Sequence, residues 1–158
     1  MIVSSSSRVY LWEFIFPSEV SHPGTCLCQG VEFMGQPKAE AFYNLAKSLV
    51  EKGVPIHGVG LQCHITVGEL KADKLVANIR RFEEIGLKCI ITELDIAQDN
   101  PGSEGADVRQ AIEYCETVNA ALSEPNCPTV MIWGIKDDDS WRKAIWQGCR
   151  TLRPWAGP

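Results

Sequence analysis

Residues 89–97, with the sequence CIITELDIA, begin as an apolar run rich in β-branched side chains, which is typical of a buried strand. Two carboxylates, Glu93 and Asp95, follow in the same stretch, two residues apart. A buried carboxylate is costly unless hydrogen bonds, cations or solvent compensate it. In α/β folds, reactive groups gather at the carboxyl ends of parallel strands. The stretch therefore predicts a parallel strand whose carboxyl end carries a polar site.

Helix and strand patterns alternate on both sides of this stretch. Three segments have a helical period and three have a strand pattern, with helices predicted at 38–52, 73–85 and 106–123 and strands at 56–65, 88–96 and 129–135. About 35 residues separate one strand from the next, which is the length of a βα unit and predicts parallel strands with right-handed crossovers. An open doubly wound sheet and a (β/α)8 barrel both use this repeat.

The ends and faces of the helices follow from single residues. Gly53 and Gly86 are expected to terminate the first two helices, and Asp73 to cap the second. The third segment predicts an amphipathic helix with an apolar face formed by Val108, Ala111, Ile112, Cys115, Val118 and Leu122.

The two ends of the chain lack a sustained period of either kind. We therefore expect a poorly specified N-terminal segment over 1–30, one domain over 31–144 and an irregular tail over 145–158. The total of 158 residues and the 45% hydrophobic content are sufficient for one domain with its own core.

Charge and composition exclude several classes of partner. A net charge of −5 disfavours nucleic acid or an anionic membrane surface. No apolar run approaches the ~20 residues of a transmembrane helix. Residues 1–16 lack the basic region and cleavage site of a signal peptide, so none is expected, and the compartment stays unassigned.

The sequence contains no cofactor fingerprint. Its seven cysteines are irregularly spaced, so we expect buried or incidental thiols rather than a disulfide framework or a zinc site. Gly58 and Gly60 do not complete a nucleotide-binding motif, because Cys63 occupies the position of the third glycine. A nucleotide-binding doubly wound domain is therefore the least favoured reading, and no cofactor is expected.

Four polar residues on two strands are predicted to share one face. Side chains at i and i+2 of a strand point the same way, which pairs Gln62 with His64 and Glu93 with Asp95. Consecutive βα units usually place their strands side by side, so the four should form one cluster. Structural alternatives are a carboxylate bonded to loop amides and a core histidine, and the three ionisable residues could also bind a divalent metal.

Two tryptophans are expected near this cluster. Trp133 ends the third predicted strand, and Trp141 follows eight residues later. Aromatic rings stack on the CH faces of pyranose sugars while polar groups bind the hydroxyls, so the combination suits a carbohydrate. A place in the core is the alternative for Trp133.

Four quoted segments together resemble the family 10 glycoside hydrolases, which are mainly endo-β-1,4-xylanases built on a TIM barrel. They are GVPIHGVGLQCHI (53–65), RRFEEIGLK (80–88), IITELDI (90–96) and MIWGIKDDDSW (131–141). The resemblance implies a partial (β/α)8 barrel of about three βα units, from the fifth helix through the eighth strand. It also implies retaining hydrolysis of β-1,4-xylosidic bonds, with xylan or xylo-oligosaccharides as the binding partners.

The resemblance assigns roles to individual residues. It implies that Glu93 is the catalytic nucleophile, that His64 hydrogen-bonds it, and that Asp95 holds the histidine. It further implies contacts with the bound sugar from Gln62, Trp133 and Trp141.

The sequence departs from the family in two places. The family's acid/base glutamate lies in a motif like DVVNE, which this sequence does not contain. A chain without it is expected to be weakly active or inactive alone, or to be a non-catalytic carbohydrate-binding remnant. Some relatives carry a cysteine pair before the last strand, but here Ala121 stands opposite Cys127 in that pair. The exposed strand edges of a partial barrel are also expected to favour self-association. Relatives are mostly secreted.

Overall fold

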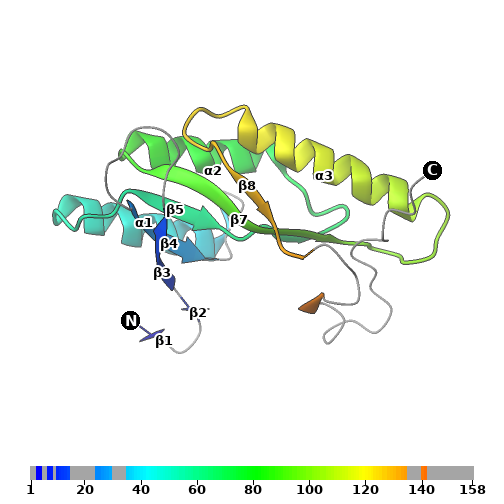
Figure 1. The fold of residues 1–158 in the computed structure, drawn as a ribbon, viewed down its shortest axis with the longest axis horizontal. Helices are drawn as coiled ribbons and strands as arrows, with labels where there is room; N and C mark the ends of the chain where they lie inside the picture. The colour runs from blue at the N-terminus through cyan, green and yellow to red at the C-terminus, as the bar shows by residue number, and fades with distance from the viewer. Residues whose placement is uncertain are drawn as a thin grey trace.

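The computed structural model describes residues 35–134 and 140–141 in full, together with the backbone of four short strands nearer the N-terminus (Figure 1). The elements in chain order are β1 (Val3–Ser4), β2 (Ser7–Arg8), β3 (Tyr10–Phe14), β4 (Gly24–Gln29), α1 (Pro37–Glu51), β5 (Gly58–Leu61), β6 (His64–Thr66), α2 (Ala72–Glu84), β7 (Lys88–Ala97), α3 (Ala106–Leu122) and β8 (Val130–Ile132). The predicted tail, 145–158, lies outside the described residues.

The three helices begin and end within one residue of their predicted bounds. Gly53 and Gly86 follow α1 and α2 with φ of 70° and 78°, a left-handed conformation that glycine adopts without steric cost. The predicted cap at Asp73 is wrong, because Lys71 is the N-cap of α2 and no side chain hydrogen-bonds there. Asp73 lies in the first turn instead, where its charge favours the positive end of the helix dipole.

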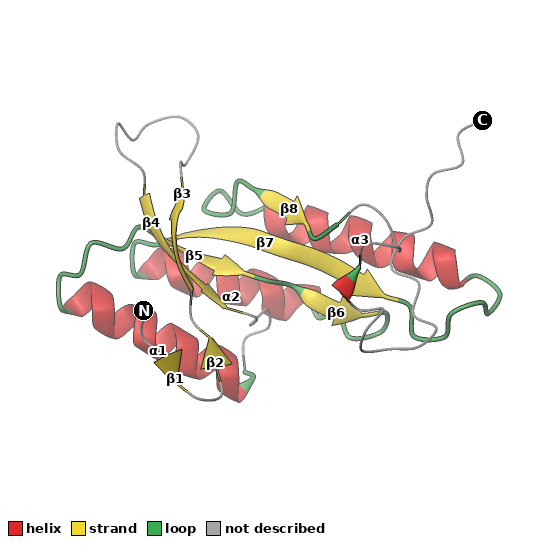
Figure 2. Ribbon diagram, turned by 60° about the horizontal axis from the view of Figure 1, so that its bottom comes forward, coloured by secondary structure: helices red, strands yellow, loops and turns green. Residues whose placement is uncertain are grey.

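The central sheet is parallel, as predicted. β7 pairs with β5 and β6 and also with β8, all in the parallel sense. Figure 2 shows β5 and β6 following one another along one edge of β7, with β8 along the other. β4 adds a parallel strand beside β5, and β3 is antiparallel to β4. No strand was predicted within residues 1–30, because the sequence there has no sustained alternation of apolar and polar residues.

The predicted strand 56–65 is broken into two pieces. β5 ends at Leu61 and β6 begins at His64, and Cys63 between them has a φ of 60°, which is uncommon for a residue other than glycine. The predicted last strand, 129–135, is shorter in the structure, since β8 covers Val130–Ile132. Residue 135 lies outside the described residues.

β7 contains one residue more than the strands on either side of it. Gly58 pairs with Lys88, whereas His64 pairs with Asp95, so the register advances by one residue between β5 and β6. The pairing with β8 shifts between Ile91 and Leu94 as well. This irregularity has the character of a β-bulge, which bends a strand and re-aims the side chains near it. Glu93 lies inside it.

The core lies between β7 and the two helices α2 and α3, which pack against each other and against β7 (Figures 1 and 2). Its largest fully buried apolar side chains are Phe42, Leu61, Leu75, Ile79, Phe82, Ile90, Ile91, Leu94 and Ile96. The rings of Phe42 and Phe82 lie 5.9 Å apart and bring α1 against α2. No described helix is both long and apolar enough to span a bilayer.

The predicted apolar face of α3 is wrong for most of its residues, although Val118 packs against the core. Val108, Ile112 and Leu122 are 61%, 51% and 51% exposed, and Cys115 is also exposed. The residues that α3 buries are instead Ala106, Gln110, Thr117 and Ala121. Small side chains allow a close approach to the sheet, and Gln110 bonds the backbone of β7, so the inward face of the helix combines small and polar side chains.

Four of the seven cysteines fall within the fully described residues, and all four are free thiols. Cys63, Cys89 and Cys127 are buried, which confirms the prediction of buried thiols for these three, whereas Cys115 is exposed. Burial raises the pKa of Cys127 to about 12, and burial also raises the pKa of Cys89 well above its ordinary value. Both thiols therefore stay protonated at neutral pH.

Candidate active site

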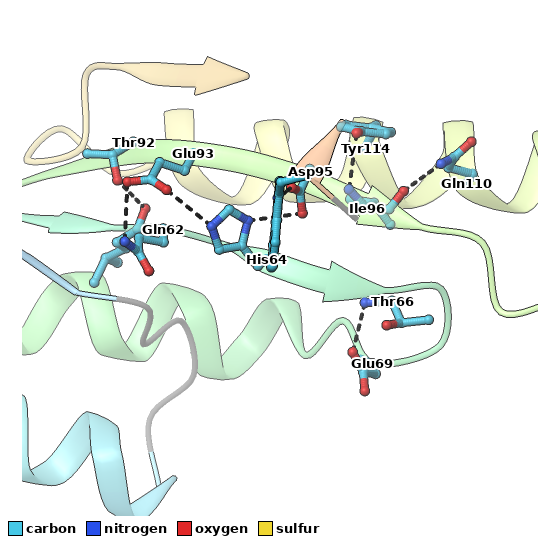
Figure 3. Close-up of polar contacts among 12 residues, drawn as sticks. Gln62, His64, Thr66, Glu69, Thr92, Glu93, Asp95, Ile96, Gln110 and Tyr114 are labelled. Atoms are coloured by element: carbon cyan, nitrogen blue, oxygen red, sulfur yellow. Dashed lines mark hydrogen bonds and ion pairs between the residues drawn. The ribbon is translucent and has the colours of Figure 1, made fainter. Parts of the chain in front are cut away.

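The bulge in β7 and the break between β5 and β6 bring four polar side chains together (Figure 3). Gln62 Nε2 donates to Glu93 Oε1 at 3.2 Å, and His64 Nε2 lies 3.2 Å from Glu93 Oε2. His64 Nδ1 lies 3.0 Å from Asp95 Oδ1. The predicted cluster therefore exists, although the strand carrying Gln62 and His64 is not continuous as the alternation argument assumed.

The backbone next to the cluster is tied across the break. The N–H of Asp95 donates to the carbonyl of Cys63 at 3.3 Å, and the hydroxyl of Thr92 donates to the carbonyl of Leu61 at 3.3 Å. These bonds hold the residues flanking Gln62 against β7 where the regular ladder is interrupted. The position of His64 opposite the two carboxylates is thus fixed by the backbone.

Solvent exposure differs among the side chains of the cluster. The Asp95 side chain is 3% exposed, whereas His64 and Glu93 are 19% and 20% exposed. His64 Nδ1 is at ion-pair distance from Asp95 but outside hydrogen-bond geometry. A carboxylate therefore lies at each ring nitrogen of His64. Asp95 serves as the buried anchor, and Glu93 keeps part of its carboxylate available to a ligand.

Trp141 completes the cluster. Its Nε1–H donates to Asp95 Oδ2 at 2.6 Å, and its ring meets the His64 ring edge-on at a centroid distance of 4.9 Å. The indole is therefore held in orientation by the same carboxylate that faces the imidazole. Trp141 is still 40% exposed, which leaves apolar ring surface next to His64.

Trp133 lies at the end of β8 rather than in the core. Its backbone N–H donates to the carbonyl of Leu94 at 2.9 Å, and the residue is 48% exposed. The indole is thus presented at the same strand ends as Glu93, which neighbours Leu94 in the chain. The alternative of a core tryptophan is wrong.

The three ionisable residues form a row rather than a metal cage. His64 lies between Glu93 and Asp95, so that each carboxylate faces a different ring nitrogen. Among the described residues, no group of three or more His, Cys, Asp or Glu side chains converges in a way that could hold a metal ion.

Sequence reasoning missed two residues of α3 that contact the strand next to this cluster. The hydroxyl of Tyr114 accepts a hydrogen bond from the N–H of Ile96 at 3.0 Å, and the Gln110 amide donates to the carbonyl of the same residue. Helical periodicity identifies the apolar side chains of a helix, but it does not indicate whether a polar side chain hydrogen-bonds the edge of a neighbouring strand.

Comparison with known proteins places the chain in a family. The sequence profile of glycosyl hydrolase family 10 matches residues 31–154. The chain belongs to this family. Endo-1,4-beta-xylanase C of Phanerodontia chrysosporium is 34% identical over 125 residues, covering 79% of the chain and 31% of that protein. Endo-1,4-beta-xylanase B of Thermotoga neapolitana is 35% identical over 112 residues, covering 70% of the chain and 32% of that protein.

Solved family 10 structures share the fold. Xylanase 10B of Thermotoga maritima superposes with a TM-score of 0.70 at 33% identity, over 75% of this chain and 37% of that one. A family 10 xylanase from Bispora sp. MEY-1, solved with xylobiose, gives a TM-score of 0.72 at 27% identity, over 80% of this chain and 39% of that one. The chain thus spans about a third of the relatives' length. These likenesses confirm the predicted partial TIM barrel.

Proposed function

We propose that this chain carries the nucleophile side of a retaining β-1,4-xylanase active site, with Glu93 as the nucleophile. The observation that carries the proposal is the way Glu93 is held. Gln62 and His64 each contact one of its oxygens, while its side chain stays 20% exposed in a chain of glycosyl hydrolase family 10. A carboxylate that is oriented and still accessible suits attack on a sugar carbon.

The remaining residues of the cluster orient the nucleophile. In retaining hydrolysis, the carboxylate bonds to the anomeric carbon as the bond to the leaving group breaks, and water later releases the sugar. His64 fixes the direction of Glu93, and Asp95 fixes His64 from the buried side. Two bonded partners restrict the rotation of the Glu93 carboxylate, which reduces the cost of reaching the reactive geometry.

The leaving group also needs an acid, about 5–5.5 Å from the nucleophile in retaining enzymes. Asp95 does not suit this role, because it is buried and its two oxygens face His64 and Trp141. The family's acid/base glutamate belongs to a motif that the printed sequence lacks. General acid–base assistance is worth about 10²–10⁴-fold, so we expect the chain alone to hydrolyse xylan weakly or not at all.

Xylan and xylo-oligosaccharides are the proposed ligands. The relatives reported above are named endo-1,4-beta-xylanases, and related xylanase structures contain xylobiose or xylotriose. In this chain, the exposed rings of Trp133 and Trp141 would stack on the sugar faces while Gln62 binds a hydroxyl. The acidic net charge suits a neutral polysaccharide better than a polyanion.

An activated aryl xylobioside tests the role of Glu93. A dinitrophenolate leaves without protonation, so the sugar should transfer to Glu93, and slow hydrolysis should let the glycosyl-enzyme accumulate. Intact-mass spectrometry should show one xylobiosyl adduct, and peptide mapping should place it on Glu93. Glu93→Gln should abolish the adduct, whereas Glu104→Gln, at an exposed loop position, should retain it. A folded sample without an adduct, or an adduct that survives Glu93→Gln, would contradict the proposal.

A second candidate function is carbohydrate binding without turnover. The observation in its favour is the exposure of Trp133 and Trp141, at 48% and 40%, on the rim of the cluster. Titration with xylohexaose should then change the tryptophan fluorescence without releasing reducing ends, and Trp141→Phe should reduce that change. An adduct on Glu93 in the preceding experiment would assign the catalytic role instead.

A further inference from the structure

The support of β7 changes directly after Leu94. Up to that point β8 is its neighbour, and the last pairing joins Leu94 to Ile132, with the N–H of Trp133 bonded to the carbonyl of Leu94. In a parallel ladder, alternate residues direct both backbone groups toward the same neighbour. Ile96 is therefore the next residue of β7 whose N–H and C=O point toward the β8 side, where β8 is no longer present.

Two side chains of α3 occupy the place of the absent strand (Figure 3). Tyr114 accepts from the N–H of Ile96 at 3.0 Å, and Gln110 donates to its carbonyl. Ile96 is fully buried and Gln110 is 6% exposed, so solvent has little access to either backbone group. Buried backbone groups require hydrogen-bond partners, so these two side chains replace the backbone hydrogen bonds that a neighbouring strand would supply.

Gln110 is itself held by a chain of polar contacts. The Gln98 amide donates to Gln110 Oε1 at 3.4 Å and to Asp107 Oδ1 at 2.6 Å. Gln98 follows the last residue of β7, and Asp107 lies in the first turn of α3. Three hydrogen bonds thus join the start of α3 to the end of β7: Gln98 to Asp107, Gln98 to Gln110, and Gln110 to the carbonyl of Ile96.

These contacts enclose the peptide of Asp95. On the β6 side, its N–H bonds to the carbonyl of Cys63, and Ala97 accepts from the N–H of Val67 at 2.8 Å. On the α3 side, Ile96 is bonded by Tyr114 and Gln110. Strand alternation sends the Asp95 side chain away from that of Ile96 and toward the cluster. The backbone of Asp95 is therefore fixed from both edges of β7.

We infer that Tyr114 and Gln110 are positioning residues that act through the backbone of Ile96 to place Asp95, and through Asp95 to place His64 and Trp141. The Asp95 carboxylate must satisfy two contacts at once, at 3.0 Å to His64 Nδ1 and 2.6 Å to Trp141 Nε1. Hydrogen bonds weaken steeply with small changes in distance and angle. Loss of the support from α3 should therefore be detected first at Trp141 and His64.

The indole N–H of Trp141 offers a readout of this position. In a ¹⁵N-labelled sample its resonance can be assigned by its absence in Trp141→Phe. Tyr114→Phe removes one oxygen atom and should move this resonance toward the shift of a solvent-exposed indole and speed its exchange with water. Tyr43→Phe removes a hydroxyl from a partly buried ring on α1, which packs on Phe82, and should leave the Trp141 resonance unchanged.

A second variant addresses the other contact. Gln110→Glu has nearly the same shape, but its carboxylate cannot donate to the carbonyl of Ile96. It should reproduce the shift seen in Tyr114→Phe, and this keeps the inference testable if Tyr114→Phe does not fold. A Trp141 resonance unchanged in a folded Tyr114→Phe or Gln110→Glu sample would overturn the inference, because a purely structural role would lower the melting temperature without moving this signal.

The expected effect on catalysis rests on the proposed function, whereas the expected shift of the Trp141 resonance does not. If Glu93 is the nucleophile, Tyr114→Phe should slow adduct formation about tenfold at saturating aryl xylobioside with an unchanged half-saturation concentration. Absence of an adduct in the unsubstituted chain would overturn the role of Glu93 and leave the Trp141 result interpretable. A shifted resonance with an unchanged rate of adduct formation would overturn the link from Asp95 to the nucleophile.

Discussion

Replacing Asp95 with alanine is expected to destabilise the fold more than any other substitution of an acidic residue in the cluster. The substitution removes the acceptor for Trp141 Nε1, at 2.6 Å, and the carboxylate 3.0 Å from His64 Nδ1. A hydrogen bond to a charged group contributes about 1.5–3 kcal/mol.

At the upper end of this range, losing the hydrogen bond to the buried carboxylate predicts a loss of about 3 kcal/mol in the free energy of unfolding for Asp95→Ala. Urea titration followed by far-UV circular dichroism measures it, and the midpoint should fall by about 1–2 M. The urea midpoint of Asp95→Asn should lie between those of the unsubstituted protein and Asp95→Ala, because the amide keeps the shape of the side chain and its oxygen can still accept from the indole N–H.

The matched control is Asp99→Asn, four residues further along the chain. Asp99 is 45% exposed and its pair with Arg109 is 3.4 Å long, so its removal should cost at most about 1 kcal/mol. A loss below about 1 kcal/mol for Asp95→Ala, or an equal loss for Asp99→Asn, would refute the reasoning that Asp95 is the buried anchor of the cluster.

Three further predictions compare core residues with exposed ones. Iodoacetamide at pH 8.5 should modify Cys115 in the native protein and spare Cys89 and Cys127, whose pKa values are raised by burial, and mass mapping checks this. The free energy of unfolding should fall as the pH rises from 9 toward 12, because the thiols of Cys89 and Cys127 ionise first in the unfolded chain, and a pH titration of stability checks this. Phe82→Ala should lower the unfolding free energy by about 3–5 kcal/mol, since the ring is fully buried, whereas Ile112→Ala, at a 51% exposed position, should change it by less than about 0.5 kcal/mol in the same urea titration.

Much of the central fold follows from local signals. Helices α1 and α2 end where glycine permits a left-handed residue, and the order of parallel strands follows from the βα repeat. The cluster of Gln62, His64, Glu93 and Asp95 was predicted because side-chain alternation and strand adjacency are short-range rules. The catalytic and sugar-binding roles assigned to these residues remain predictions until adduct formation and binding are measured.

The features that sequence reasoning missed depend on distant partners. The positive φ of Cys63 and the extra residue in β7 are set by how three strands meet, and no single strand records them. The burial of Gln110 depends on its bond to a backbone carbonyl of β7, so helical periodicity placed Val108, Ile112 and Leu122 inward when they face outward. The indole–carboxylate contact of Trp141 likewise joins segments 46 residues apart.

The additional residue in β7 bends the strand at the site. Three residues of β7 separate Ile91 from Asp95, whereas two residues separate their partners Leu61 and His64. Deleting a single residue from this interval would make the two spacings equal and remove the bulge, so the strand would lose the local bend that directs Glu93. Natural variation here should therefore tolerate exchanged side chains far better than a change in length, and a graft of this site onto another scaffold must carry the irregular strand with it.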